Sequence, residues 1–156
     1  GTETTDLKAC VTFCQCFGFR RREIASLTGD KMKRNENGVL FVRVQNGKGG
    51  KKRWAMFCGT PKEEKLIVDL MTQASSTKVF SHIHSKADIH GYRAVYASKL
   101  YKRYARPIES LERAEKYICR KDKAGIVYDR RAMKIVSKQL GHNRISVIAS
   151  DYLHNV

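Results

Sequence analysis

Groups suited to binding and cutting a phosphodiester occur at four separate places along this chain of 156 residues. The first is a run of arginines after Gly18-Phe19, followed by Glu23. An arginine can donate two parallel hydrogen bonds to phosphate oxygens, and a nearby glutamate can hold its guanidinium in place. By itself, such a run is more often a solvated basic helix end. The candidate phosphate-binding residues here are Arg20, Arg21 and Arg22.

The second place is a glycine-rich turn between two apolar segments. Glycines allow the backbone to approach a polyanion closely, and a lysine on such a turn can protonate a leaving oxygen. The turn lacks the residue spacing of a nucleotide-binding P-loop, and a solubilising turn is the alternative interpretation. Its basic residues are Lys48, Lys51, Lys52 and Arg53.

The third and fourth places combine proton-transfer groups with arginines. His90 and Arg93 are three residues apart, so on a helix they lie on one side near its N-terminus. Leu-Gly precedes His142, Arg144 follows it, and Tyr152 comes ten residues after the histidine. A tyrosine spaced in this way from apolar residues on a helix is usually a core residue. The functional alternative makes its phenol an attacking nucleophile.

Apolar periodicity and turn residues predict the elements that must position these groups. The predicted helices are 4–17, 21–27, 61–71, 88–106, 131–140 and 144–153. The predicted strands are 39–44 and 53–57, and a short hairpin is expected to pair 117–120 with 126–128. The polar stretch 30–38, which ends on Asn-Gly, predicts a turn. The sequence therefore predicts an α+β fold, mostly helical with a small antiparallel β-sheet.

The charge balance points to a polyanionic partner. Thirty-one basic and fifteen acidic residues give a net charge of +16, and nucleic acid is the usual polyanion that neutralises such an excess. No apolar run is long enough to span a membrane. The five cysteines are odd in number and irregularly spaced, which predicts buried free thiols and a reducing compartment.

Taken together, the four places resemble the catalytic domain of the tyrosine recombinases, the integrases of phages and transposons. That family shows a Gly-Leu-Arg-x-x-Glu box, a lysine on a β-hairpin, His-x-x-Arg, Leu-Gly-His and then a tyrosine. The positions that match in this chain, in the same order, are Gly18-Phe19-Arg20 with Glu23, Lys48, His90 with Arg93, His142 and Tyr152. Each box is common by itself, whereas all of them in order make a specific signal.

The resemblance implies site-specific DNA recombination or integration without ATP. Tyr152 would attack the scissile phosphate and form a 3′-phosphotyrosyl bond. Arg20 and Arg93 would neutralise the non-bridging oxygens, and His142 would donate a hydrogen bond to the same oxygens. His90 would help to take the phenol proton. A second set of residues would contact the duplex, namely Arg21, Arg22, Lys51, Lys52, Arg53 and Arg144.

Further implications concern Lys48, the cofactor and the partners. Lys48 would protonate the departing 5′-oxygen, and Glu23 would support the arginines. No metal or cofactor is expected, because cationic side chains take the place of a metal. The implied partner is double-stranded DNA and not a membrane. The implied location is the nucleoid in the cytoplasm of a bacterium, the host of a mobile genetic element.

The chain also departs from the family pattern. Phe19 and Tyr92 replace leucines, and Asp151 would raise the phenol pKa if it were close and charged. The gap from His90 to His142 is longer than usual, so residues 107–129 are interpreted as an inserted segment. We expect residues 1–156 to be one catalytic domain without the N-terminal DNA-binding clamp domain. Such a domain is expected to be monomeric alone and tetrameric on DNA in the full-length protein.

Two other functions fit part of the sequence. A non-catalytic nucleic-acid-binding domain suits the charge equally well but has no need of the histidines and the tyrosine. A metal-dependent nuclease is disfavoured because the acidic residues do not cluster. A zinc site at His82, His84, Asp88 and His90 is also disfavoured, because its spacing is irregular.

Overall fold

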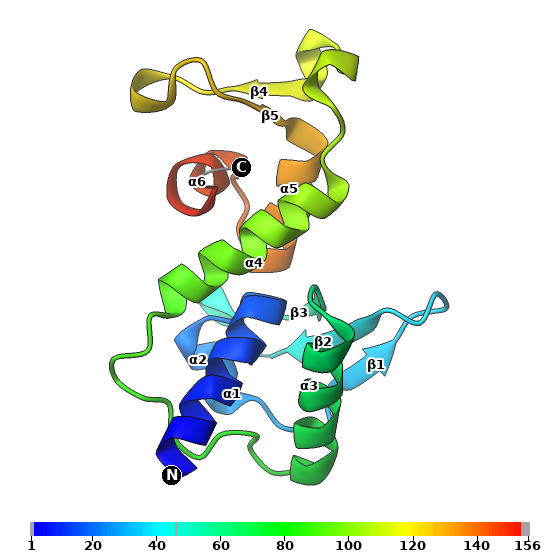
Figure 1. Ribbon diagram of the computed structural model, residues 1–156, viewed down its shortest axis with the longest axis vertical. Helices are drawn as coiled ribbons and strands as arrows, with labels where there is room; N and C mark the ends of the chain where they lie inside the picture. Colours follow the sequence, from blue (N-terminus) through cyan, green and yellow to red (C-terminus); the bar gives the residue numbers. More distant parts are fainter. Residues whose placement is uncertain (1, 46, 154–156) are drawn as a thin grey trace.

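The structure is a computed structural model that describes residues 2–45 and 47–153, with side chains from residue 6 onward. A long central helix, α4 (Ile89–Tyr104), runs between two groups of elements (Figure 1). The first group contains α1 (Thr2–Phe17), α2 (Arg21–Ser26), α3 (Pro61–Ala74) and a three-stranded sheet. The second contains α5 (Arg130–Leu140), α6 (Ile145–Val147) and a two-stranded hairpin. The predicted α+β class is confirmed, and every helix except the last lies close to its predicted bounds.

The three-stranded sheet is antiparallel, in the order β1 (Met32–Arg34), β2 (Leu40–Val44) and β3 (Arg53–Met56). Strands β2 and β3 confirm the predicted strands 39–44 and 53–57, and they pair as an antiparallel hairpin. Strand β1 corrects the prediction that 30–38 is only a turn. It is a short edge strand in which Lys33 and Arg34 are exposed, so it lacks the apolar alternation by which a strand is predicted. Lys33 instead places its ammonium 4.2 Å from the centre of the Trp54 ring.

Two apolar clusters form the core, one on each side of α4. The first joins α1, the sheet and α3, and its largest buried side chains include Phe13, Phe17 and Ile67. The second joins α4, α5 and the C-terminal segment through Leu100 and Met133. Helix α4 thus fixes the position of the first group of elements relative to the second.

Gly18 ends α1 at the point where three elements meet. Its φ of +71° lies in the left-handed region, and an added Cβ would lie 2.6 Å from Tyr96 and 2.7 Å from Leu140. We therefore expect Gly18→Ala to lower the free energy of unfolding by about 2–4 kcal/mol, through backbone strain and overpacking together. Gly38→Ala is the matched control, because its φ is +80° and nothing lies within 4 Å. Urea unfolding that gives equal losses for both variants would show that packing at Gly18 is not tight.

The segment 107–129 forms three single-turn 3₁₀ helices and a hairpin. The 3₁₀ turns are η2 (Ile108–Ser110), η3 (Arg113–Glu115) and η4 (Lys121–Lys123). The hairpin pairs β4 (Lys116–Ile118) with β5 (Val127–Asp129), which confirms the predicted pairing with slightly different bounds. Its base is fixed to the end of α4 because Arg106 donates to both carboxylate oxygens of Asp129 at 2.9 Å. This pair holds the pKa of Asp129 well below its ordinary value despite burial.

The predicted single helix over 144–153 is wrong in its detail. One turn of α6 is followed by a π-helical turn, η5 (Ile148–Tyr152), and the amide of Leu153 donates to the carbonyl of Ile148 at 3.0 Å. Both Tyr152 and Leu153 are buried. Single π turns are rare and occur often at functional sites, so this turn marks the segment for closer description.

Within residues 2–45 and 47–153, no helix is both long and apolar enough to cross a membrane.

Candidate functional site

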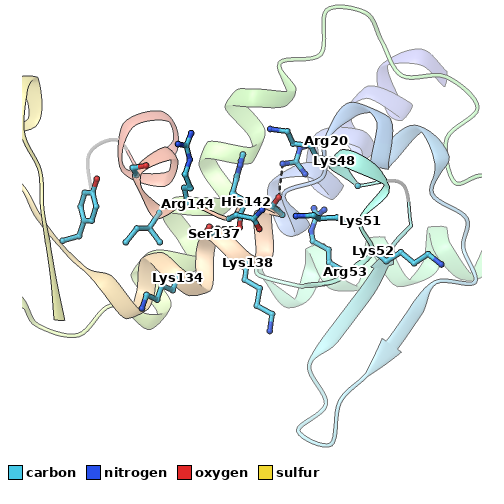
Figure 2. A pocket seen from close by; sticks show the side chains of 16 residues that line it. Arg20, Lys48, Lys51, Lys52, Arg53, Lys134, Ser137, Lys138, His142 and Arg144 are labelled. Carbon is cyan, nitrogen blue, oxygen red and sulfur yellow. Dashed lines mark hydrogen bonds between the residues drawn. The ribbon is translucent and has the colours of Figure 1, made fainter. Parts of the chain in front are cut away.

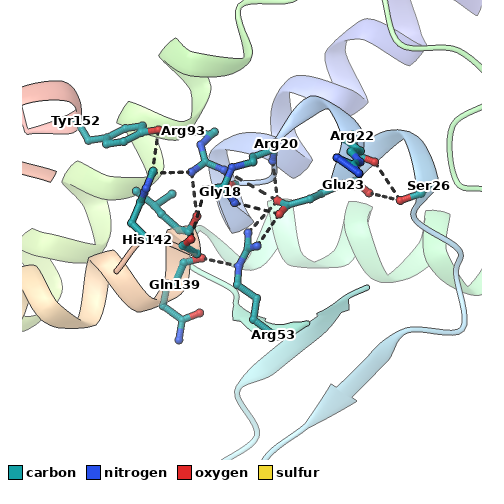
Figure 3. Close-up of polar contacts among 12 residues, drawn as sticks. Gly18, Arg20, Arg22, Glu23, Ser26, Arg53, Arg93, Gln139, His142 and Tyr152 are labelled. Carbon is teal, nitrogen blue, oxygen red and sulfur yellow. Dashed lines mark hydrogen bonds and ion pairs between the residues drawn. The ribbon is translucent and has the colours of Figure 1, made fainter. Parts of the chain in front are cut away.

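The phenol of Tyr152, at the end of η5, lies close to the loop after α5 and to the first turns of α4 (Figure 3). Its oxygen is 3.3 Å from Nε2 of His142, which follows α5. The His90 ring, in the first turn of α4, has its centre 4.8 Å from the centre of the tyrosine ring. The guanidinium carbon of Arg93 is 5.5 Å from the same centre. The fold thus brings together four of the predicted catalytic residues from distant parts of the chain.

Arg93 is the most buried cation of the site, with 3% of its side chain exposed. Its guanidinium donates to the carbonyl oxygens of Gly18 and Leu140, each at 2.9 Å. Burial lowers the pKa of Arg93, and the phenol of Tyr152 opposes that change. An arginine remains protonated at neutral pH even when its pKa falls, so the site holds a fixed, desolvated positive charge beside the phenol.

Glu23 connects three arginines below the site. Arg53 donates to both carboxylate oxygens, at 2.6 and 2.9 Å. Arg20 lies 3.2 Å and Arg93 4.0 Å from the same carboxylate. Burial would raise the pKa of Glu23, but hydrogen bonds and charge from Arg53 and Arg20 outweigh it and lower that pKa. Glu23 is therefore ionised, and it orients the guanidinium of Arg20, whose side chain is 22% exposed at the rim.

The contacts of His142 define its protonation state. Its Nε2 is 3.4 Å from Nη2 of Arg93, and an arginine nitrogen only donates, so we assign Nε2 as the acceptor. The phenol O–H of Tyr152 then donates to the same nitrogen. Burial, followed by the charges of Arg93 and Arg20, lowers the pKa of His142 to about 4. The ring is therefore neutral at pH 7 and presents a free base to the phenol.

His90 and His142 make different contacts with Tyr152. The resemblance to the tyrosine recombinases implies that His90 helps to take the phenol proton and that His142 donates a hydrogen bond to the phosphate oxygens. In the structure Nε2 of His90 lies 3.2 Å from the carbonyl oxygen of Asp151, while its ring packs against that of Tyr152. The imidazole nitrogen in contact with the phenol oxygen is that of His142.

A basic pocket of about 780 Å³ opens beside this cluster (Figure 2). The tip of the β2–β3 hairpin forms one wall and α5 with the following loop forms the other. Lys48, at the start of the 3₁₀ turn η1 (Lys48–Gly50), shares the pocket with Arg20 and His142. The other basic residues of the lining are Lys51, Lys52, Arg53, Lys134, Lys138 and Arg144.

Lys134 and Lys138 were missed by sequence reasoning. They lie four residues apart on α5 and so share one face of the helix. That spacing, directly before the Leu-Gly-His motif, was the available signal. Ordinary solvated lysines show the same spacing, so the sequence alone does not separate the two cases.

Two of the residues expected to contact DNA, Arg53 and Arg21, have hydrogen-bond partners inside the protein. Arg53 is paired with Glu23, donates from Nε to the carbonyl of Gln139 at 3.1 Å, and has 12% of its side chain exposed. Arg21 donates to the carbonyl oxygens of His84 and Ala87, at 3.0 and 2.9 Å, and so fixes the loop before α4. Arg22 is exposed on α2 and does not line the basic pocket. The prediction used only the local sequence around Arg53 and Arg21. It could not identify the carboxylate and the carbonyl groups that bind them in the folded chain.

The cysteines and the histidine-rich loop were the other groups of residues that could have bound a metal. Cys10, Cys14, Cys16, Cys58 and Cys119 are free and buried, which confirms that prediction. Across the described part of the chain, no three His, Cys, Asp or Glu side chains gather in a way that suits a metal ion.

Comparison of the chain with protein families, with curated proteins and with solved structures finds no match in any of the three. The residues and their geometry therefore carry the functional argument.

The low pKa of His142 predicts how the stability of the protein depends on pH. The unfolded ring titrates near its ordinary pKa of 6.5, whereas the folded ring titrates near 4. Between these values the unfolded chain binds more protons, so this contribution to stability is complete above pH 6.5 and is lost as the pH falls toward 4. We expect the wild-type protein to lose more stability between pH 7 and pH 5 than His142→Gln, measured by urea unfolding. Imidazole NMR signals that showed His142 half protonated near pH 6.5 would contradict the assignment.

Proposed function

We propose that this protein cuts and rejoins DNA strands through a covalent phosphotyrosyl intermediate, the chemistry of site-specific recombination and integration. The observation that supports it most is the Tyr152 phenol, buried against the neutral His142 and the cationic Arg93 beside a basic pocket. A tyrosine that served only the core would not need a free base and a fixed cation. The order of these residues along the chain, which resembles the tyrosine recombinases, supports the same reaction.

The first half of the reaction follows from these contacts. The Tyr152 oxygen attacks the scissile phosphorus, and its proton passes to Nε2 of His142, which already accepts its hydrogen bond. Arg93 and Arg20 neutralise the charge that develops on the non-bridging oxygens. We therefore assign the base to His142, and we give His90 the task of orienting the tyrosine ring by stacking.

The second half releases the 5′ end. The bond from phosphorus to the 5′-oxygen breaks as the Tyr152–phosphorus bond forms, and Lys48 gives its proton to the departing oxygen. Reversal of these steps with a 5′-hydroxyl from another strand restores a phosphodiester and frees Tyr152. Because one phosphoester bond replaces another, the cycle consumes no ATP, and the cationic side chains do the work of a metal.

Double-stranded DNA is the partner in this proposal, and the duplex contacts both walls of the pocket, Lys51 and Lys52 on the hairpin and Lys138 and Arg144 on the other side. We propose that the protein is monomeric without DNA, that four protomers assemble on DNA, and that it works at the bacterial nucleoid. Sedimentation of the isolated protein as a stable oligomer would contradict the monomer.

A covalent-adduct assay tests the function itself. The protein is mixed with labelled duplexes of randomised sequence, each of which carries one nick. Cleavage a few nucleotides from the nick releases a short fragment that carries the 5′-hydroxyl, and its loss by diffusion traps the covalent intermediate. We expect a protein–DNA band on a denaturing gel, formed equally in EDTA and in Mg²⁺. Tight, salt-sensitive binding without any adduct favours the alternative, a non-catalytic nucleic-acid-binding domain.

The role of Lys48 has its own test. Lys48→Ala is expected to slow cleavage about 10²–10⁴-fold, the usual contribution of a general acid. A substrate with sulfur in place of the bridging 5′-oxygen has a leaving group that needs no proton, so the same variant is expected to cleave it at close to the wild-type rate. Lys62→Ala, exposed on α3, is the control. Equal defects on both substrates would show that Lys48 binds DNA and does not transfer a proton.

A further inference from the structure

The β4–β5 hairpin reaches the segment that carries Tyr152. In Figure 1 the hairpin lies above α6, and the 3₁₀ turn η4 lies between its two strands in the sequence. The ammonium of Lys123, at the end of η4, donates to the carbonyl oxygens of Ala149 and Leu153, the latter at 3.0 Å. The hydroxyl of Tyr128 on β5 donates to the Leu153 carbonyl as well, at 3.2 Å. The segment 107–129 thus contacts the backbone on both sides of Tyr152.

These contacts answer a need of the π turn. The last carbonyl groups of a helical segment lack partners within the helix, and a buried carbonyl without a partner is costly. Ala149 and Leu153 are 4% and 0% exposed, so water has little access to them. A cation at this end of the turn also complements its partial negative charge. The turn of η5 is short, and the hairpin supplies partners that the turn itself does not.

The hairpin is in turn fixed to the helix that carries the rest of the site. At its base the amide of Asp129 donates to the Tyr101 hydroxyl at 2.9 Å, and the carboxylate binds Arg106. Helix α4 carries Tyr101, and it also carries His90 and Arg93. Two groups that contact the Tyr152 segment are therefore both attached to α4. His90 and Arg93 belong to the helix, and the hairpin is bonded to its C-terminal end.

We propose that Lys123 is a positioning residue for the nucleophile, and that the hairpin β4–β5 is a brace that sets where the Tyr152 oxygen lies relative to His142 and Arg93. The inference rests on the proposed function, because it concerns the same tyrosine. Lys123 acts through the backbone at Ala149 and Leu153 and touches neither the phosphate nor the phenol. A tyrosine misplaced by about 1 Å would react about 100-fold more slowly.

The test compares Lys123→Met, Lys123→Arg and Lys121→Met. Methionine keeps the length of the lysine chain without its charge, and arginine keeps donors for both carbonyls. Lys121→Met removes the same charge from the same turn at an exposed position. For each variant, amide hydrogen exchange of residues 148–153, affinity for uncut duplex and the rate of adduct formation are measured. The amide of Leu153, which bonds within the turn, is the most direct reporter.

We expect Lys123→Met to speed exchange at Leu153 about tenfold, the effect of losing its hydrogen bonds, and to slow adduct formation about 100-fold with unchanged DNA affinity. Lys123→Arg is expected to restore most of both, and Lys121→Met to change neither. Unchanged exchange in Lys123→Met overturns the brace. Faster exchange with an unchanged cleavage rate overturns the positioning role. If the wild-type protein forms no adduct at all, the proposed function fails and the positioning role fails with it, while the exchange data still decide whether the brace exists.

Discussion

Tyr152→Phe is expected to abolish the covalent protein–DNA adduct while DNA binding stays intact. Phenylalanine keeps the ring that packs against His90 and lacks only the attacking oxygen. Loss of a nucleophile from a preorganised site costs about 10⁶-fold in rate, which lies below detection on a gel. The fold should tolerate the change, because one hydrogen bond to His142 is worth about 1 kcal/mol. The measurement is adduct yield on nicked duplexes, beside the dissociation constant for uncut DNA.

Tyr104→Phe supplies the matched control. It also removes a tyrosine hydroxyl, but one near the end of α4. That hydroxyl contacts the sulfur of Met56 at 3.5 Å and does not line the basic pocket. Its adduct yield is expected to equal that of the wild type. An adduct that persisted in Tyr152→Phe would assign the attack to another residue and remove the basis of the proposed mechanism.

Glu23→Gln is expected to be the most destabilising single change at the site. The carboxylate is 1% exposed and binds Arg53 and Arg20 directly, with Arg93 at 4.0 Å. A neutral amide offers these guanidinium groups one oxygen and no charge. Breaking a buried pair from one side costs about 3–5 kcal/mol, which corresponds to a fall of about 10 °C in Tm for a domain of this size. Thermal and urea unfolding measure the loss.

The comparison variant is Asp69→Asn, which breaks the exposed pair with Lys65 on α3. Surface pairs contribute about 0–1 kcal/mol, so little change is expected. Because the pKa of Glu23 is lowered in the folded protein, its contribution is present above the ordinary carboxylate range and is lost as the pH falls below it. A Glu23→Gln protein as stable as Asp69→Asn would mean that the three arginines do not depend on this carboxylate.

Much of the fold was predictable because its elements have strong local signals. Thr60 before Pro61 begins α3, and the hydroxyl of Thr60 accepts from the amide of Glu63. Gly141 ends α5 with a φ of +75°. Strand β1 was not predictable, since two of its three residues are exposed and polar, and only its pairing with β2 makes it a strand. The π turn η5 was not predictable either, because its spacing differs from that of an α-helix by only one residue.

The site was predictable in its members and less so in its contacts. Residue types and their order suggested Arg20, Arg93, His142 and Tyr152. The structure brings the last three into contact, and Arg20 is connected to Arg93 through Glu23. Which histidine contacts the phenol depends on how η5 turns, and local sequence does not encode that. The pairing of Arg53 with Glu23 spans 30 residues, and the contact of Lys123 with Ala149 spans 26. Such long-range partners are set by tertiary packing and leave no pattern in the local sequence.

The most direct test of the account is to identify the covalent bond itself. The trapped adduct is digested with nuclease and protease, and the modified peptide is sequenced by mass spectrometry. We predict a nucleotide joined through its 3′-phosphate to the oxygen of Tyr152, together with a released DNA fragment that ends in a 5′-hydroxyl. Cleavage that requires a divalent metal, leaves 5′-phosphate ends and modifies no peptide would contradict the account.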